Sequence, residues 1–230
     1  MRAADRFVNA AERALVALLC RVDDADIRRV PLEGPLILVT NHVNFLEIPV
    51  VRSRLRPRRV VALAKAEAWE QPILGWLFDL WGAIPVRRGE ADLRALRASL
   101  EALRRRDILV VAPEGTRSRD GILRRGRPGV VTLGARSGAP LLPLAFFGGE
   151  QLGTHLRRLR RTPFSIRVGE PFCIAPHATR LPREERQVAA DEVMTRLAAL
   201  LPPPYRGVYS DLTGPVRYLH SCSLEEGMQR

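Results

Sequence analysis

The sequence predicts a single α/β domain built on a mostly parallel central sheet with helices on its faces. Short apolar runs alternate with stretches of helical spacing along the 230 residues. Several of these runs end abruptly in polar residues, as buried parallel strands do. We expect the domain to occupy residues 31–201, with an N-terminal amphipathic helix in 1–30 and a loosely ordered tail in 202–230, where Pro and then Ser and Gly recur.

Residues 6–22 have the spacing of an amphipathic helix. Such a helix either lies in a membrane interface or packs on the core, and both alternatives stay open. No stretch reaches the roughly 20 apolar residues of a membrane-spanning helix, and no signal-peptide pattern is present. The expected apolar side is formed by Phe7, Ala10, Ala11, Ala14, Leu15, Leu18 and Leu19, opposite Asp5, Arg6, Glu12 and Arg13.

The remaining elements follow from apolar runs and helical periodicity. Strands are expected at 36–41, 58–65, 82–89, 107–112 and 141–147, with an edge strand at 164–168. Helices are expected at 47–55, 92–106, 129–136 and 184–201.

Residues 69–81 contain all three tryptophans and a phenylalanine. A core helix can be this apolar, but clustered tryptophan is typical of membrane interfaces. The composition therefore favours a lipid-facing or acyl-lining segment.

The cysteines and the net charge indicate the compartment and the kind of partner. Cys20, Cys173 and Cys222 are few and far apart, without a disulfide framework or metal-ligand spacing, which predicts a reducing compartment, the cytoplasm. The net charge of +12 favours polyanionic partners, either nucleic acid or anionic lipid. Nucleic acid is disfavoured because no stacking aromatics interleave with the basic clusters.

His42 and Glu47 follow the first apolar strand and are the first candidates for chemistry. A carboxylate that holds one imidazole nitrogen lets the other nitrogen act as a general base, so the pair could activate a hydroxyl. The alternative is structural, with a surface histidine and with Asn41 or Asn44 as a helix cap. Lys65, the one lysine in the chain, Arg88 and Glu114 lie at other strand ends, where ligands of parallel sheets gather.

Four sequence blocks, NHVNFLE, GAIPVRR, APEGTRS and LLPLAF, begin at residues 41, 82, 112 and 141. In this order and spacing they resemble the glycerolipid acyltransferase family, the 1-acylglycerol-3-phosphate acyltransferases and their relatives. The resemblance covers roughly residues 35–175, and the third block is the most specific.

The resemblance implies a role for each matching position. His42 would be the general base, and Glu47 would orient it. Lys65 and Arg88 would contact phosphate, whereas Glu114, Gly115, Thr116 and Arg117 would hold a glycerol phosphate, and Pro143 matches the fourth block. The departures are Glu47 where Asp is usual, Asn44 where Ser is common, and Arg87 where an acidic residue is common.

The resemblance also implies partners and a location. It implies acyl transfer from acyl-CoA or acyl carrier protein to a lysophospholipid, with 1-acylglycerol 3-phosphate as the family's commonest acceptor. No cofactor or metal is expected. The location would be an anionic membrane surface on the cytoplasmic face of the cell membrane. The alternative is a family member without efficient chemistry that binds lipid at the membrane surface.

Overall fold

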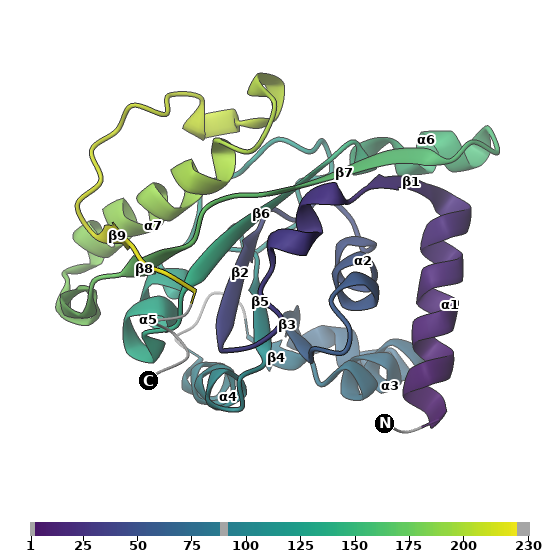
Figure 1. The fold of residues 1–230 in the computed structure, drawn as a ribbon, viewed down its shortest axis with the longest axis horizontal. Coiled ribbons are helices and arrows are strands. Elements are labelled where there is room, and N and C mark those ends of the chain that lie inside the picture. The colour runs from purple at the N-terminus through teal and green to yellow at the C-terminus, as the bar shows by residue number, and fades with distance from the viewer. Residues whose placement is uncertain (1–2, 88–91, 225–230) are drawn as a thin grey trace.

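The computed structural model describes residues 3–87 and 92–224, and in this part of the chain one sheet carries nine strands (Figure 1). The strand order is β1-β7-β6-β2-β5-β3-β4, with β8 beside β6 and β9 beside β8. The strands are β1 (Cys20–Asp23), β2 (Leu36–Thr40), β3 (Val60–Lys65), β4 (Ile84–Val86), β5 (Ile108–Val111), β6 (Leu141–Phe147), β7 (Thr162–Val168), β8 (Phe172–Ile174) and β9 (Leu219–Ser221). The helices are α1 (Ala3–Leu19), α2 (Glu47–Arg54), α3 (Pro72–Trp81), α4 (Leu93–Arg104), α5 (Gly129–Ser137), α6 (Leu152–Arg157) and α7 (Arg183–Ala198).

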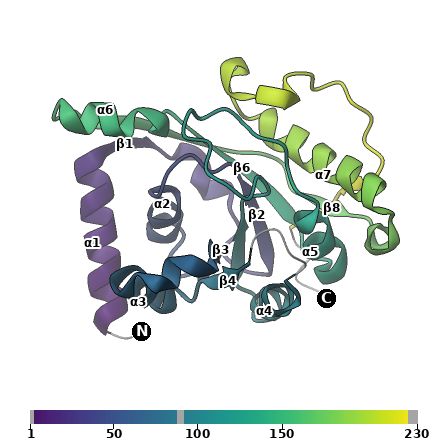
Figure 2. The ribbon, with the colours of Figure 1, turned by 180° about the vertical axis from the view of Figure 1, so that it is seen from behind.

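Strand β2 lies in the middle of the sheet, parallel to β5 on one side and to β6 on the other. Its successive side chains point to opposite faces of the sheet. Leu36 and Leu38 join the core under α1 and α2, whereas Ile37 and Val39 join the core under α4, α5 and α7. Figures 1 and 2 show these two helical layers. The mostly parallel α/β fold expected from the sequence is confirmed.

Strand β7 is an interior strand, so the prediction of an edge strand at residues 164–168 is wrong. It pairs antiparallel with β6 and parallel with β1. Residues 20–22, expected to belong to the N-terminal helix, lie in β1 instead. The helix ends at Leu19, and the chain then runs in an extended conformation beside β7. Cys20, the first residue of β1, is buried.

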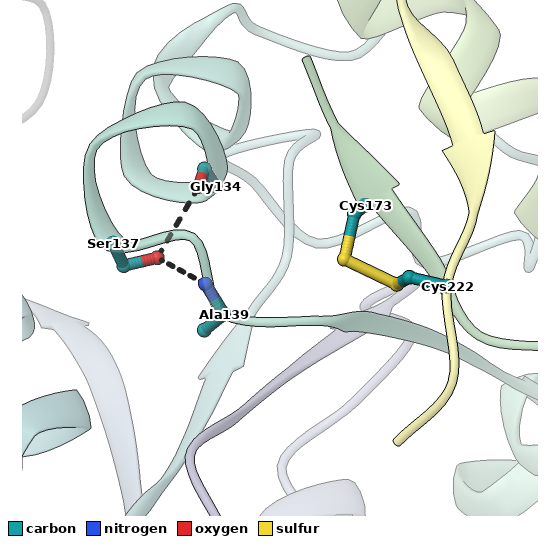
Figure 3. Close-up of a disulfide and its surroundings, with 5 residues drawn as sticks. All are labelled: Gly134, Ser137, Ala139, Cys173 and Cys222. Atoms are coloured by element: carbon teal, nitrogen blue, oxygen red, sulfur yellow. Dashed lines mark hydrogen bonds between the residues drawn. A yellow bond between two sulfur atoms is a disulfide. The ribbon is translucent and has the colours of Figure 1, made fainter. Parts of the chain in front are cut away.

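The C-terminal segment packs on the domain, so the expectation of a loosely ordered tail is wrong for residues 202–224. Strand β9 pairs antiparallel with β8, and the buried Tyr209 donates a hydrogen bond to Asp191 of α7 at 2.7 Å. A disulfide joins Cys173 to Cys222 near the end of α5 (Figure 3). The sequence interpretation of unpaired cysteines is therefore wrong, and the inference of a reducing compartment loses its basis.

Helix α1 turns its apolar side outward. Phe7 and Leu18 are 75% and 72% exposed, whereas Glu12 is only 7% exposed and faces inward. The Glu12 carboxylate lies 3.7 Å from the guanidinium of Arg52 on α2. Burial raises the pKa of Glu12, and Arg52 opposes that rise. Within residues 3–87 and 92–224, no helix is both long and apolar enough to cross a bilayer.

The tryptophan-rich segment is a 3₁₀ turn at Ala66–Glu70 followed by α3. The rings of Trp69 and Phe78 are 5.1 Å apart. Only Gly75 of α3 is buried, and Ile73 and Trp76 are exposed. The segment is therefore not a core helix, which leaves the lipid-facing expectation open.

Candidate active site

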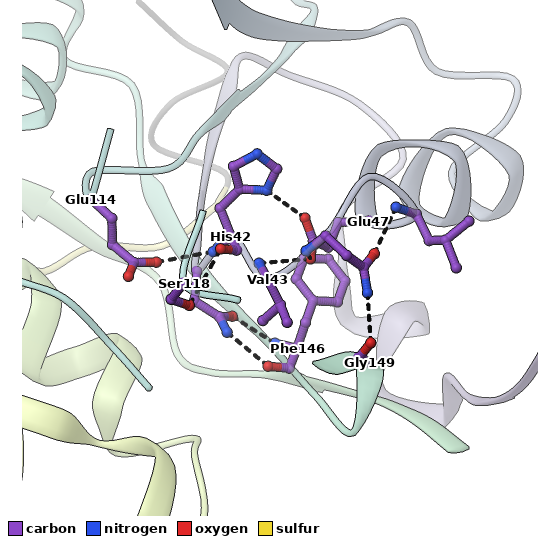
Figure 4. A network of polar contacts seen from close by, with 10 residues as sticks. His42, Val43, Glu47, Glu114, Ser118, Phe146 and Gly149 are labelled. Carbon is purple, nitrogen blue, oxygen red and sulfur yellow. Dashed lines mark hydrogen bonds and ion pairs between the residues drawn. The ribbon is translucent and has the colours of Figure 1, made fainter. Parts of the chain in front are cut away.

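His42 and Glu47 meet at the carboxyl end of β2 (Figure 4). The Nδ1 atom of His42 lies 2.6 Å from Oε2 of Glu47. Because an ionised carboxylate only accepts hydrogen bonds, this contact places a proton on Nδ1 and leaves Nε2 as an acceptor. Nε2 has no hydrogen-bond partner among the residues that the structure describes. The histidine side chain keeps 27% of its surface exposed, whereas that of Glu47 keeps 3%.

The local sequence places Glu47 because the turn before α2 folds back onto the carboxylate of this helix's first residue. The Asn44 side chain accepts from the Leu46 amide at 2.8 Å. Oε1 of Glu47 accepts from the amides of Asn44 at 2.6 Å and Val43 at 2.8 Å. Hydrogen bonds from two backbone amides fix one carboxylate oxygen, while the other oxygen contacts His42. The helix cap considered for Asn44 is not formed, since the N-cap position of α2 is Leu46; Asn44 instead closes the turn that precedes Glu47.

The main chain of His42 is held from the third block. Its amide donates to Oε1 of Glu114 at 3.0 Å. Its carbonyl accepts from the amide of Ser118 at 2.7 Å and from that residue's hydroxyl at 3.3 Å. These bonds fix the position of the imidazole, and the sequence interpretation did not single out Ser118.

Glu114 is a buried carboxylate, 2% exposed, held by main-chain donors. Its second oxygen accepts from the amide of Arg124 at 2.8 Å. Desolvation raises the pKa of Glu114 to about 7, against the opposing effect of its two amide donors. Each oxygen accepts one main-chain hydrogen bond, so this side chain links the main chains of His42 and Arg124. The direct contact with substrate that the resemblance implies stays a prediction.

Asn41 and Asn44 of the first sequence block are hydrogen-bonded to β6 and to the turn that follows it. The Asn41 side chain both donates to the carbonyl and accepts from the amide of Phe146, each at 2.7 Å. The Asn44 amide group donates to the carbonyl of Gly149 at 2.9 Å. Figure 4 shows these bonds beneath the dyad. The sequence interpretation gave Asn41 only a capping role. Its position at the end of a buried apolar run was the feature that could have indicated a buried hydrogen-bonding role.

The rest of the third block forms an exposed turn beside the histidine. The amide of Gly115 donates to the carbonyl of Ala112 at 3.1 Å, and Gly115 has φ +66°. Glycine adopts this left-handed backbone without cost. Thr116 and Arg117 are exposed, and Arg117 makes no ion pair or side-chain hydrogen bond within the described residues. Its guanidinium is available to an anion.

Two further predicted phosphate contacts lie at neighbouring strand ends. Lys65 ends β3 with its side chain half-exposed, and its ammonium lies 3.4 Å from Glu67. Arg88 falls outside the described residues. Its neighbour Arg87 donates its main-chain amide to Asp92, which also caps α4. Since β3, β4, β5 and β2 run parallel, their carboxyl ends share one edge of the sheet.

The arrangement suits activation of a hydroxyl near an anion. An oriented imidazole with an exposed nitrogen can take a proton, and an exposed guanidinium binds phosphate oxygens in pairs. Among residues 3–87 and 92–224, no three His, Cys, Asp or Glu side chains are grouped as metal ligands.

Comparison with known proteins identifies the family. The family model described as acyltransferase matches residues 21–147. The chain belongs to the acyltransferase family. His42, Glu47 and the third block lie within this match, and so does the whole of β6.

Named relatives of the acyltransferase chain come from plants and bacteria. It is 28% identical over 118 residues to the chloroplastic 1-acyl-sn-glycerol-3-phosphate acyltransferase BAT2 of Brassica napus, a match that covers 50% of this chain and 34% of the plant protein. It is 31% identical over 142 residues to a lyso-ornithine lipid O-acyltransferase of Pseudomonas aeruginosa, covering 55% of this chain and 54% of that protein. The chain thus spans about a third of the plant relative and about half of the Pseudomonas relative.

Two longer matches agree with these relatives. A 1-acyl-sn-glycerol-3-phosphate acyltransferase of Bacillus subtilis is 23% identical over 192 residues, covering 83% of this chain and 93% of that protein. The crystal structure of the 1-acyl-sn-glycerophosphate acyltransferase PlsC from Thermotoga maritima superposes with a TM-score of 0.59 at 23% identity. That superposition covers 85% of this chain and 78% of PlsC, so the two share a fold.

Proposed function

We propose that this protein transfers a fatty acyl group from an acyl thioester, acyl-CoA or acyl carrier protein, to the free hydroxyl of a lysophospholipid. The contact between His42 and Glu47 is the observation that carries the proposal. The longer glutamate, in place of the usual aspartate, reaches the imidazole, and hydrogen bonds from the amides of Val43 and Asn44 hold its side chain there. The exposed Arg117 beside the dyad supports an anionic acceptor.

The reaction is a direct transfer. Nε2 of His42 takes the proton of the acceptor hydroxyl while that oxygen forms a bond to the thioester carbonyl carbon. The carbon–sulfur bond then breaks, and the imidazolium gives its proton to the leaving thiolate, which returns the histidine to its neutral form. Glu47 stabilises the imidazolium between these steps. General-base catalysis of this kind contributes roughly 10²- to 10⁴-fold.

The first candidate acceptor is 1-acylglycerol 3-phosphate, which would give phosphatidic acid. Support comes from the names of the Brassica and Bacillus relatives and from the exposed cations Arg117 and Lys65 near the dyad. The Pseudomonas relative favours a second candidate, a lyso-ornithine lipid. That acceptor presents a hydroxyl without a phosphate, so the two candidates make different demands on Arg117.

We place the enzyme at an anionic membrane surface, on the cytoplasmic face of the cell membrane, with α1 and α3 toward the lipid. The outward side of α1 carries Phe7, Leu15 and Leu18, and α3 adds Ile73 and Trp76. Exposed apolar side chains gathered on two helices favour an interface over water. The chain's net charge of +12 supports anionic headgroups.

The test follows thiol release from acyl-CoA, and in parallel from acyl carrier protein, with each acceptor presented in detergent micelles. We expect acceptor-dependent release that is lost in His42→Ala at unchanged melting temperature. Arg117→Gln should raise KM for 1-acylglycerol 3-phosphate far more than for a lyso-ornithine lipid. No release with either donor across a panel of lysolipids would instead favour a lipid-binding protein without efficient chemistry.

A further inference from the structure

Helix α6 ends in a Schellman motif with leucine where glycine is usual. The amide of Arg160 donates to the carbonyl of His155 at 2.9 Å, and the amide of Leu159 to that of Leu156 at 3.1 Å. These are the two bonds of that motif, with Leu159 at the left-handed position. Leu159 has φ +51° and is 94% exposed.

Within the described residues, the side chain of Leu159 makes no contact that would stabilise the fold in return for its backbone conformation. A side chain other than glycine or asparagine is strained in the left-handed region, and an exposed leucine buries no apolar surface. Glycine at this position would relieve the strain at no cost in packing. A bulky side chain held in such a conformation points to a partner outside the chain.

Positive charge surrounds this leucine. Arg157, Arg158 and Arg160 are exposed, and none has an ion pair or side-chain hydrogen bond within the described part of the chain. Leu156, one turn earlier, is also exposed. Two leucines and three unpaired guanidinium groups therefore share one short segment, which we name the arginine-leucine loop (residues 156–160).

The loop is tied to the end of α1. Arg161 donates from Nε at 3.1 Å and from Nη2 at 2.6 Å to the carbonyl of Cys20, the residue after α1. Cys20 also pairs with Thr162 where β1 runs beside β7. Leu18, on the outward side of α1, lies two residues before this contact. Figure 1 shows α6 and the C-terminal end of α1 at the same end of the molecule.

We propose that the arginine-leucine loop is a membrane anchor that inserts Leu159 and Leu156 into an anionic bilayer while Arg157, Arg158 and Arg160 contact its headgroups. The inference rests on the proposed function, since it assumes an enzyme of lipid substrates, and it names a docking element separate from α1 and α3. Apolar tips within a ring of arginine fit an interface that is apolar at depth and anionic at its surface. Nucleic acid would use the arginines but not the exposed aliphatic side chains.

The decisive variant is Leu159→Gly, because it removes the anchor and relieves the backbone. We expect its melting temperature to equal or exceed that of the wild type. Its affinity for phosphatidylglycerol/phosphatidylcholine vesicles, measured by flotation, should fall roughly tenfold, the effect of losing one buried leucine. Val208→Gly is the matched control: Val208 is 70% exposed on the C-terminal segment away from α1, and its loss should leave vesicle affinity unchanged.

The charges are tested separately. Replacing Arg157, Arg158 and Arg160 by glutamine should weaken binding to the anionic vesicles by roughly fivefold for each arginine, and should leave binding to pure phosphatidylcholine unchanged. Equal vesicle affinity of Leu159→Gly and wild type would overturn the proposal. So would an arginine effect of the same size on neutral vesicles, or one seen only with an oligonucleotide.

Acyl transfer to detergent-dispersed acceptor separates this inference from the proposed function. We expect Leu159→Gly to retain wild-type turnover in micelles while losing vesicle affinity. A wild-type protein that binds vesicles through the loop but transfers no acyl group would contradict the proposed function and support the membrane anchor. A protein that is active in micelles, but whose vesicle affinity does not change in Leu159→Gly, would support the proposed function and contradict the membrane anchor.

Discussion

At the scale of single residues, Glu47 shows how one carboxylate can contact both the backbone and the candidate general base. Its Oε1 accepts hydrogen bonds from the amides of Val43 and Asn44, and its Oε2 lies against Nδ1 of His42. The hydrogen bonds from these amides restrict the side chain before any substrate binds. The turn that leads from β2 into α2 therefore also orients the imidazole.

Glu47→Gln tests the dyad. The glutamine retains one oxygen for the backbone amides but brings no charge to His42, so we expect kcat to fall roughly 10²- to 10⁴-fold with a small change in KM. Thiol-release kinetics and a thermal melt measure the two effects. Glu47→Asp, which keeps the charge, should retain partial activity. A glutamine variant within about twofold of wild type would mean that the contact has no catalytic role.

Glu114 makes the stability of the protein depend on pH. Its pKa in the folded protein is about 7, above the ordinary value of 4.5, so between these pH values the folded state binds more protons than the unfolded state. The stabilisation is fully present below pH 4.5 and is lost as the pH rises toward 7. The slope from this group is at most about 1.4 kcal/mol per pH unit.

Glu114→Gln isolates that dependence. We expect the free energy of unfolding of the wild type to fall more steeply between pH 4.5 and 7 than that of the variant, in urea titrations at each pH. The variant should be less stable overall, because an amide cannot accept from the amides of both His42 and Arg124 as the carboxyl does. Parallel curves for the two proteins would assign the pH dependence to other groups.

At the scale of elements, the C-terminal strand is held to the domain by a covalent bond and by pairing with one neighbouring strand. β9 has three residues and pairs only with β8 within the described chain. Leu219 is the one residue of β9 that is buried. The disulfide between Cys173 and Cys222 closes a sequence separation of 49 residues across this pair of strands.

Reduction should therefore destabilise the protein. Opening a loop of this length lowers the free energy of unfolding by about 4 kcal/mol, which for a chain of this size lowers the melting temperature by roughly 8–16 °C. Melting in the presence and absence of dithiothreitol measures the shift. Cys222→Ser is the control, and its melting temperature should not respond to the reductant. A similar response of both proteins would show that the reductant acts on stability by a route other than this disulfide.

At the scale of the whole molecule, apolar and basic surface coincide at one end. Helices α1, α3 and α6 lie toward the same side of the fold (Figures 1 and 2), and each of them carries exposed apolar side chains. The net charge of +12 adds a long-range attraction to anionic lipid. Charge should bring the protein to the bilayer, and apolar side chains should hold it there.

This division predicts a salt dependence. Affinity for anionic vesicles should fall roughly tenfold or more as NaCl rises from about 0.05 to 0.5 M, because the screening length shortens severalfold. Affinity for phosphatidylcholine vesicles should be weak and nearly independent of salt. Flotation at each salt concentration gives both values, and a salt-independent affinity for anionic vesicles would contradict the electrostatic contribution.

The sequence by itself determined the fold class and the positions of most elements. The runs at β2, β5 and β6 are apolar along their length, as strands covered on both faces are, and periodicity located α4 and α7. It also indicated the pairing of His42 with Glu47, five residues apart at a strand end, while a structural role stayed open; the resemblance of the four blocks then assigned the pair its role. These features depend on neighbours within a few residues of each other.

Only the tertiary structure decided what depends on distant residues. Strand β1, the interior place of β7 and the disulfide each need partners more than 40 residues away, which no periodicity reveals. The same holds for the bonds from Glu114 and Ser118 to His42, 72 and 76 residues apart. The outward apolar side of α1 belongs here too, because the sequence shows that a helix has two sides but not which one the fold covers.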